Sequence, residues 1–145
     1  MRLALDLNLP ADSRLLGATR SAVQTYLLEL GTPLSIVQDV VLAMDEACAN
    51  VLQHAYPDGG DVTYVVRAGL DPEQILIEVV DDGVGFDIMA PPRGPDVEGL
   101  LAPGGRGLEL MRRLMTTVEV ESPTATGGTR LRLVRRLPPT GVLSD

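Results

Sequence analysis

The stretch that decides the fold reads Asp45-Glu46-Ala47-Cys48-Ala49-Asn50-Val51-Leu52-Gln53-His54-Ala55-Tyr56. Its apolar residues continue a helical spacing that begins upstream, which predicts an amphipathic helix from about Pro33 to about His54. Glu46 and Asn50 are four residues apart, so their side chains share one face of that helix. By helical phase this face lies roughly opposite the apolar stripe. The stripe consists of Val37, Val40, Val41, Met44, Cys48, Val51, Leu52 and Ala55.

This polar pair has two interpretations. The amide oxygen of Asn50 is a hard ligand that suits Mg²⁺, and the carboxylate of Glu46 could act as a general base. The same two residues could instead belong to an ordinary solvated helix face. His54 could orient a site or satisfy local backbone carbonyls, and Cys48 is expected to be a small buried core residue.

Two segments rich in glycine lie further along the chain. In Asp81-Asp82-Gly83-Val84-Gly85-Phe86-Asp87, Gly83 and Gly85 permit positive φ and a close backbone approach after an apolar strand. A carboxylate fixed at Asp81 could accept a hydrogen bond from an exocyclic amine such as adenine N6. An ordinary turn at the end of a strand would have the same composition.

The second segment, Gly104-Gly105-Arg106-Gly107, precedes Leu108 and opens a predicted helix. Backbone N–H groups at a helix N-terminus can hold an anion, although a flexible connector would also contain glycines. Arg106 could pair with a phosphate or be solvated. Thr129 could hydrogen-bond near a base or simply favour a strand.

Composition narrows the classes of function. The net charge of −8 argues against a nucleic-acid binder and suits solubility or a basic protein partner. All twelve basic residues are arginine, which excludes the two nucleotide sites that need a lysine, the Walker-type loop and the site typical of protein kinases. Cys48 is the single cysteine, so neither an intrachain disulfide nor a cysteine-based zinc cluster can form. The sequence shows no signal layout and no apolar run of about 20 residues, so we expect a cytoplasmic protein with no membrane segment.

The pattern along the chain predicts the element order βααββαββ. We expect strands at residues 2–9, 62–68, 75–80, 118–121 and 129–137, and helices from Asp12 or Ser13 to about Leu30, from Thr32-Pro33 to about His54, and from Gly107 to about Met115. Such an order favours a two-layer α/β sandwich: a mixed, mostly antiparallel sheet of about five strands covered on one face by about three helices. We expect one domain over residues 1–138 and a tail at 139–145. The region from Ile88 to Gly105, rich in proline and glycine, is expected to be a mobile loop.

Together the three segments resemble the GHKL ATPase superfamily, which has the Bergerat fold. The helix with its asparagine corresponds to residues 45–56, the first glycine box to residues 81–86 and the second to residues 105–108. The pattern DEAxxNxxxHAY and the small size are most similar to the anti-sigma-factor serine kinases.

The resemblance implies a role for each matching residue. Asn50 would coordinate Mg²⁺ at the phosphates of ATP, and Glu46 would be the base that activates a serine hydroxyl. Asp81 would bind adenine N6, with Gly83 and Gly85 shaping that wall and Thr129 near the base. The phosphates would lie against Gly105, Arg106, Gly107 and Leu108, and residues 88–104 would form a lid over ATP.

The resemblance also implies partners. Members of this family bind a sigma factor, phosphorylate a serine on an anti-anti-sigma protein of the STAS fold, and often form homodimers. Two other functions stay open on the sequence: a non-catalytic switch, in which ATP orders a partner-binding surface, and an interaction module with a vestigial pocket.

Overall fold

A five-stranded sheet with helices on one face forms the described part of the molecule, which comprises residues 3–55, 63–81, 107–121 and 128–139 of a computed structural model. The strands are β1 (Leu3–Pro10), β2 (Thr63–Leu70), β3 (Gln74–Asp81), β4 (Thr117–Glu121) and β5 (Thr129–Arg136). The helices are the short 3₁₀ turn η1 (Ser13–Leu15), α1 (Leu16–Glu29), α2 (Leu34–Asn50), the π-helical turn η2 (Val51–Ala55) and α4 (Gly107–Leu114). The order βααββαββ is therefore confirmed for the described residues.

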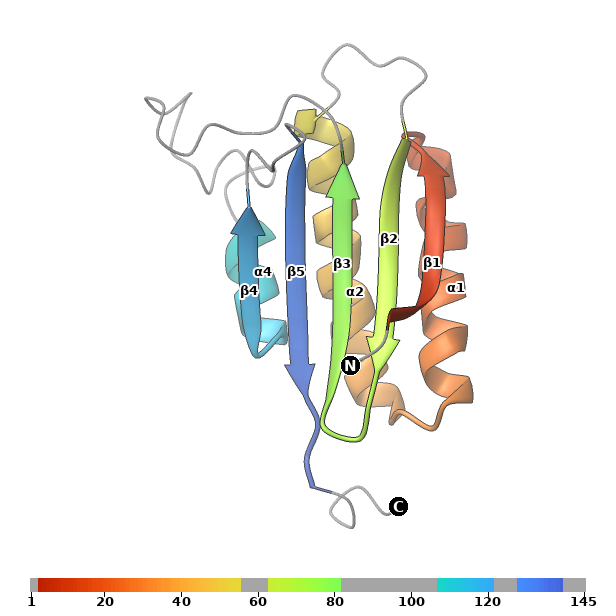
Figure 1. Cartoon of the computed structure of the whole chain (residues 1–145), viewed down its shortest axis with the longest axis vertical. Helices are drawn as coiled ribbons and strands as arrows, with labels where there is room; N and C mark the ends of the chain where they lie inside the picture. Colours follow the sequence, from red (N-terminus) through yellow and green to blue (C-terminus); the bar gives the residue numbers. More distant parts are fainter. Residues whose placement is uncertain (1–2, 56–62, 82–106, 122–127, 140–145) are drawn as a thin grey trace.

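The strands lie in the order β1-β2-β3-β5-β4, and each neighbouring pair is antiparallel. The helices α1, α2 and α4 all lie behind the sheet in Figure 1, with α2 between the other two. This arrangement confirms the predicted two-layer sandwich. The pairing of β3 with β5 matters most for the site, because it places the end of β3 beside the start of β5.

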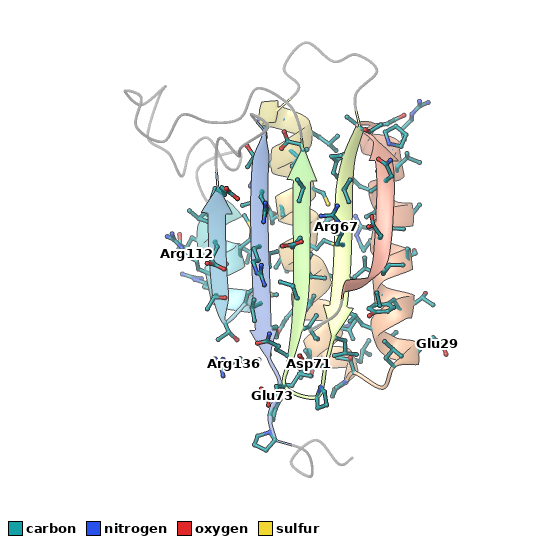
Figure 2. The ribbon with its side chains drawn as sticks, in the orientation of Figure 1. Glu29, Arg67, Asp71, Glu73, Arg112 and Arg136 are labelled. Atoms are coloured by element: carbon teal, nitrogen blue, oxygen red, sulfur yellow. The ribbon has the colours of Figure 1, made fainter. Side chains whose placement is uncertain are left out.

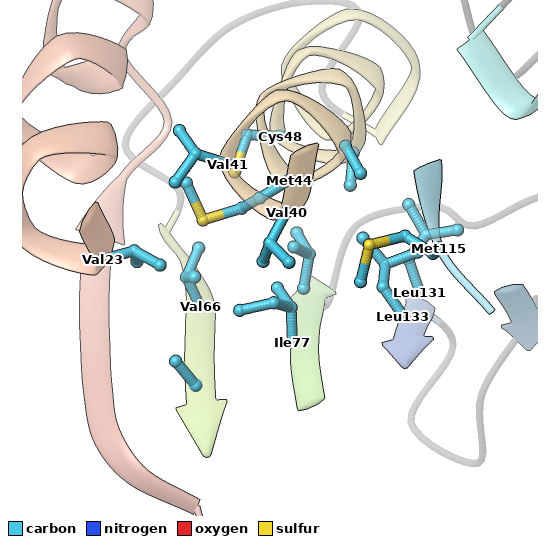
Figure 3. Close-up of a cluster of buried hydrophobic side chains, with 14 of the residues drawn as sticks. Val23, Val40, Val41, Met44, Cys48, Val66, Ile77, Met115, Leu131 and Leu133 are labelled. Atoms are coloured by element: carbon cyan, nitrogen blue, oxygen red, sulfur yellow. The ribbon is translucent and has the colours of Figure 1, made fainter. Parts of the chain in front are cut away.

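The core lies between the sheet and α2. Alternate residues of the strands point towards the helices, and there they meet the apolar stripe of α2 (Figure 3). Val40, Met44, Ile77 and Leu133 are at most 1% exposed. Burying one such side chain stabilises the fold by about 1.5–3 kcal/mol, so an aliphatic core compensates for the scarcity of aromatic residues.

The helix boundaries follow local chemistry. Gly31 ends the first helical segment with φ of 93°, a conformation that favours glycine, as the sequence predicts. The prediction of Thr32 as the next N-cap is wrong by one residue. Pro33 occupies the N-cap with ψ of 142°, and α2 begins at Leu34. The backbone N–H of Thr32 donates instead to the carbonyl of Leu27, so Thr32 completes the preceding turn.

The predicted hairpin between β2 and β3 is confirmed. The carboxylate of Asp71 accepts hydrogen bonds from the backbone N–H groups of Glu73, at 2.7 Å, and Gln74, at 3.0 Å. An aspartate that bonds its own backbone two residues on is a common way to fix a tight turn. The turn sets the register in which Tyr64 faces Asp81.

A row of alternating charges crosses the face of the sheet that the helices leave open. The cross-strand partners follow one another from β1 to β4 as Asp6, Arg67, Glu78, Arg132 and Glu119. Arg67 lies over this face in Figure 2. Consecutive members form ion pairs with N–O distances between 3.3 and 3.9 Å. Glu78 in the centre is only 5% exposed, because an arginine lies on each side of it.

None of the helices in the described ranges has the length and apolar character that a membrane span requires. Several predictions from the sequence fall outside the described residues. They are the turn at 57–60, the loop at 88–105, most of the turn at 123–128 and the tail beyond 139.

Candidate functional site

Three buried side chains form a row at the end of the sheet where β3 finishes and β5 begins. Asp81 has Tyr64 of β2 as its direct partner on one side and Thr129 of β5 on the other. The exposed fractions are 2% for Tyr64, 2% for Asp81 and 4% for Thr129. Directly opposed residues project from the same face of a sheet, and Leu131, two residues after Thr129, is in the core. The row therefore lies on the face that the helices cover.

Tyr64 is a site residue that the sequence did not single out. Burial raises the pKa of the Cys48 thiol to about 12, while a hydrogen bond with Tyr64 acts in the opposite direction. Cys48 is 1% exposed, which confirms the prediction that it is a core residue. Tyr64 thus links the row to Cys48 of α2, which lies two residues before Asn50. The available signal was its alternation with Val66 along the predicted strand.

Asn50 is the last residue of α2 and is only 2% exposed. Among the described residues, neither its amide nitrogen nor its amide oxygen has a hydrogen-bond partner. A buried polar group without a partner costs about 1–3 kcal/mol, so a protein keeps one where a ligand completes it. The chain also changes from α to π geometry directly after Asn50, and π turns are frequent at functional sites.

The expectation that Asn50 faces away from the buried side of its helix is wrong. The helix α2 packs against α1 on one side and α4 on the other, in addition to the sheet. A helix with neighbours on two sides buries more than one stripe. Ala43, Ala47 and Asn50, at spacings of four and three residues, form a second buried stripe beside the first.

Glu46 is half-buried and lies one turn before Asn50. The chain runs upward through α2 and downward through α4 in Figure 1, so the end of α2 and the start of α4 lie at the same end of the molecule. Gly107 and Leu108, in the first turn of α4, are both buried. The carboxylate, the amide and the first turn of α4 therefore lie at the end of the sheet where Asp81 and Thr129 pair.

The remaining predicted site residues lie outside the described residues: Gly83, Gly85, Gly105 and Arg106, together with the predicted lid at 88–104. His54 lies in η2, and its side chain is likewise outside the description. Their roles stay predictions.

The donor set fits a magnesium ion that takes most of its ligands from elsewhere. No group of three or more histidine, cysteine, aspartate or glutamate side chains gathers in the described part of the chain to make a metal cage. Mg²⁺ commonly uses one or two protein oxygens together with water and substrate phosphates. A single buried amide oxygen at Asn50 suits that mode of binding.

Comparison with known proteins connects this geometry to a family. The family model described as histidine kinase-like ATPase domain matches residues 9–135. A serine-protein kinase RsbW of Bacillus velezensis is 30% identical over 124 residues, covering 81% of this chain and 78% of that protein. The RsbW of Bacillus pumilus is 32% identical over 126 residues, with the same two coverages.

Solved structures share the fold. The RsbU and RsbW domains of a Mycobacterium tuberculosis protein match 92% of this chain with a TM-score of 0.67 at 24% identity. The present chain spans 31% of that longer chain. The SiaB–SiaC complex from Pseudomonas aeruginosa matches 92% of this chain and 89% of its own, with a TM-score of 0.60 at 19% identity.

Proposed function

Because this chain belongs to the histidine kinase-like ATPase family and its curated relatives are serine-protein kinases, we propose that it transfers the γ-phosphoryl group of Mg-ATP to a serine of a partner protein. The observation that carries the proposal is the buried amide of Asn50, which lacks a partner among the described residues and lies at the same end of the fold as the Asp81–Thr129 pair. Residues 1–138 act as a single ATP-binding unit in this proposal.

Asn50 holds the metal through its amide oxygen. Bound Mg²⁺ neutralises charge on the phosphates and fixes their orientation. The backbone N–H groups of Gly105 and Gly107 contact the phosphates, beside Arg106 and Leu108. Since the chain has no lysine, positive charge at the phosphates comes from the metal and arginine.

Glu46 accepts the proton of the serine hydroxyl. It lies one helical turn from Asn50, so a carboxylate oxygen lies on the same side of α2 as the metal ligand. Phosphoryl transfer depends mainly on positioning and charge stabilisation, and a base in this place orients the attacking oxygen.

Asp81 binds the base. Its carboxylate accepts a hydrogen bond from the exocyclic N6 amine of adenine, which guanine replaces with a carbonyl at the equivalent position. Thr129, directly across the ladder, lies beside the base, and Gly83 and Gly85 form the wall that follows β3. This chemistry selects ATP over GTP.

The partner that receives the phosphate is an anti-anti-sigma protein of the STAS fold. A sigma factor is the second partner, which the protein binds and holds inactive. The protein acts in the cytoplasm and forms a homodimer. These assignments rest on the family resemblance of residues 45–56, 81–86 and 105–108.

The first experiment measures nucleotide binding by calorimetry, with ATP and GTP, in the presence of Mg²⁺ and of a chelator. We expect wild type to bind Mg-ATP in preference to Mg-GTP, and Asp81→Asn to lose that preference. Asp6→Asn, an exposed carboxylate on the opposite face of the sheet, is the matched control. Absence of ATP binding at millimolar nucleotide would reject the kinase.

The second experiment tests transfer. STAS-domain proteins encoded in the same genome are incubated with the chain and γ-labelled ATP, and phosphoserine is located by mass spectrometry. Binding of ATP without labelling of any STAS protein would leave a nucleotide-dependent binding switch in place of a kinase.

A further inference from the structure

The side chain of Arg135 joins three elements of the fold at the end opposite the candidate site. Its Nη1 donates to Oδ2 of Asp39 in α2 at 2.9 Å and to the backbone carbonyl of Leu114, the last residue of α4, at 2.8 Å. Arg135 itself belongs to β5. One guanidinium group therefore bonds α2 and α4 from the strand that lies beneath them.

The two side chains of this ion pair are partly buried. The side chain of Arg135 is 25% exposed and that of Asp39 is 40% exposed. A carbonyl in the last turn of a helix has no partner within the helix, and a cation near it also interacts favourably with the helix dipole. Hydrogen bonds from a charged donor are stronger than neutral ones. The guanidinium thus fixes the C-terminal end of α4 relative to α2.

Each of the three elements carries a proposed nucleotide-binding residue towards its other end. In β5 this residue is Thr129, in α2 it is Asn50, and in α4 it is Gly107. Asp39 and Leu114 accept from the same guanidinium nitrogen, so they lie at about the same height along the two helices. Since α2 and α4 run antiparallel, seven residues of rise along each helix, about 10 Å, bring Glu46 to about the height of Gly107. Asn50 lies one turn beyond.

The two halves of the candidate site depend to different degrees on the bonds that Arg135 forms with Asp39 and Leu114. The base half, Asp81 and Thr129, is held by the backbone ladder between β3 and β5, which needs no side-chain bond. The phosphate half depends on where the first turn of α4 lies beside Glu46 and Asn50. The helix α4 has only eight residues, so moving its far end shifts its first turn as well.

We infer that Arg135 is a positioning residue for the phosphate half of the site: by bonding Asp39 and Leu114 it sets the position of the first turn of α4 against α2. The inference rests on the proposed function, since it needs phosphates at that turn. A purely structural ion pair would affect the binding of base and phosphates alike, whereas Arg135 in this role affects binding of the phosphates and leaves binding of the base nearly unchanged.

The experiment compares dissociation constants for Mg-ATP and for adenosine, which contains the base and lacks the phosphates. The variants are Arg135→Gln, Arg135→Lys and Asp39→Asn, and all are measured at a temperature where circular dichroism shows them folded. The control is Arg20→Gln, which breaks the ion pair with Asp45 between α1 and α2, on the other side of the same helix.

We expect Arg135→Gln to weaken ATP binding by about 2- to 30-fold, the range of remote coupling effects, while adenosine binding changes by less than that. Asp39→Asn should weaken ATP in the same direction, Arg135→Lys should restore part of the loss, and Arg20→Gln should leave the ratio of the two constants unchanged.

Equal weakening of ATP and adenosine, or unchanged ATP binding in Arg135→Gln, would overturn the inference and leave the proposed function standing. A wild-type chain that binds neither ligand would overturn the proposed function, and the inference with it.

Discussion

Replacing Asn50 by leucine should make the free protein more stable and abolish its binding of Mg-ATP. Leucine has the same number of side-chain heavy atoms as asparagine, branched at the same carbon, and no polar atom to leave without a partner. Both amide atoms of Asn50 are buried without a hydrogen-bond partner among the described residues. Since a buried polar group without a partner costs about 1–3 kcal/mol, the free energy of unfolding should rise by a similar amount.

The assays are urea denaturation without nucleotide, thermal denaturation with and without Mg-ATP, and ATP calorimetry. For a domain of 145 residues, 1 kcal/mol corresponds to about 3–5 °C in melting temperature, so the variant should melt about 3–15 °C higher. Added Mg-ATP should raise the melting temperature of wild type and have no effect on Asn50→Leu. The control is Asn8→Leu, at an exposed position of β1, which should change neither the melting temperature nor the affinity for Mg-ATP appreciably. If Asn50→Leu lost more than about 1 kcal/mol of stability in the free protein, the amide would already have a partner and the reasoning would be refuted.

Three further changes test other parts of the structure. Glu46→Gln should lower the rate of phosphoryl transfer by about 10²- to 10⁴-fold with ATP affinity nearly unchanged; wild-type turnover in a labelling assay would contradict its role as base. Glu78→Ala should lower the free energy of unfolding by about 1–3 kcal/mol, because Arg67 and Arg132 lose their shared partner, while calorimetry should give an unaltered ATP affinity. The pKa of Cys48 is about 12 in the folded protein, against 9.0 for the free thiol. Between these values the unfolded thiol ionises while the folded thiol stays protonated, so the free energy of unfolding should fall as pH rises from about 9 towards 12. Cys48→Ala should remove that part of the pH dependence in denaturation curves.

The element order and the layer arrangement could be predicted because each helix and strand has its own local pattern. The stripe of Val37, Val40 and Met44 and the stop at Gly31 depend on residues a few positions apart. The boundary at Pro33 was missed by one residue because Thr32 forms a bond back to Leu27, which only the folded turn reveals.

The site was predicted in part. Asp81 and Thr129 were chosen for separate reasons, and their direct pairing depends on the antiparallel register of β3 and β5, which the sequence does not contain. The burial of Asn50 was missed for a similar reason: helical phase describes one helix, whereas burial also depends on the helices α1 and α4 that pack beside it. Arg135 has no local signal, because its partner Asp39 lies 96 residues away in the sequence. Tyr64 had only its alternation with Val66 along the strand, because its partner Cys48 lies 16 residues away.

The row of charges on the open face of the sheet contributes little to the electrostatic field that a distant partner experiences. Neighbouring strands are about 4.8 Å apart, so opposite charges alternate over a length well below the screening distance of about 8 Å at physiological ionic strength. Their fields cancel within a few ångströms of the surface. A basic partner approaching the chain is therefore steered by the acidic groups elsewhere that give the net charge of −8, and it meets the centre of this face only at contact range.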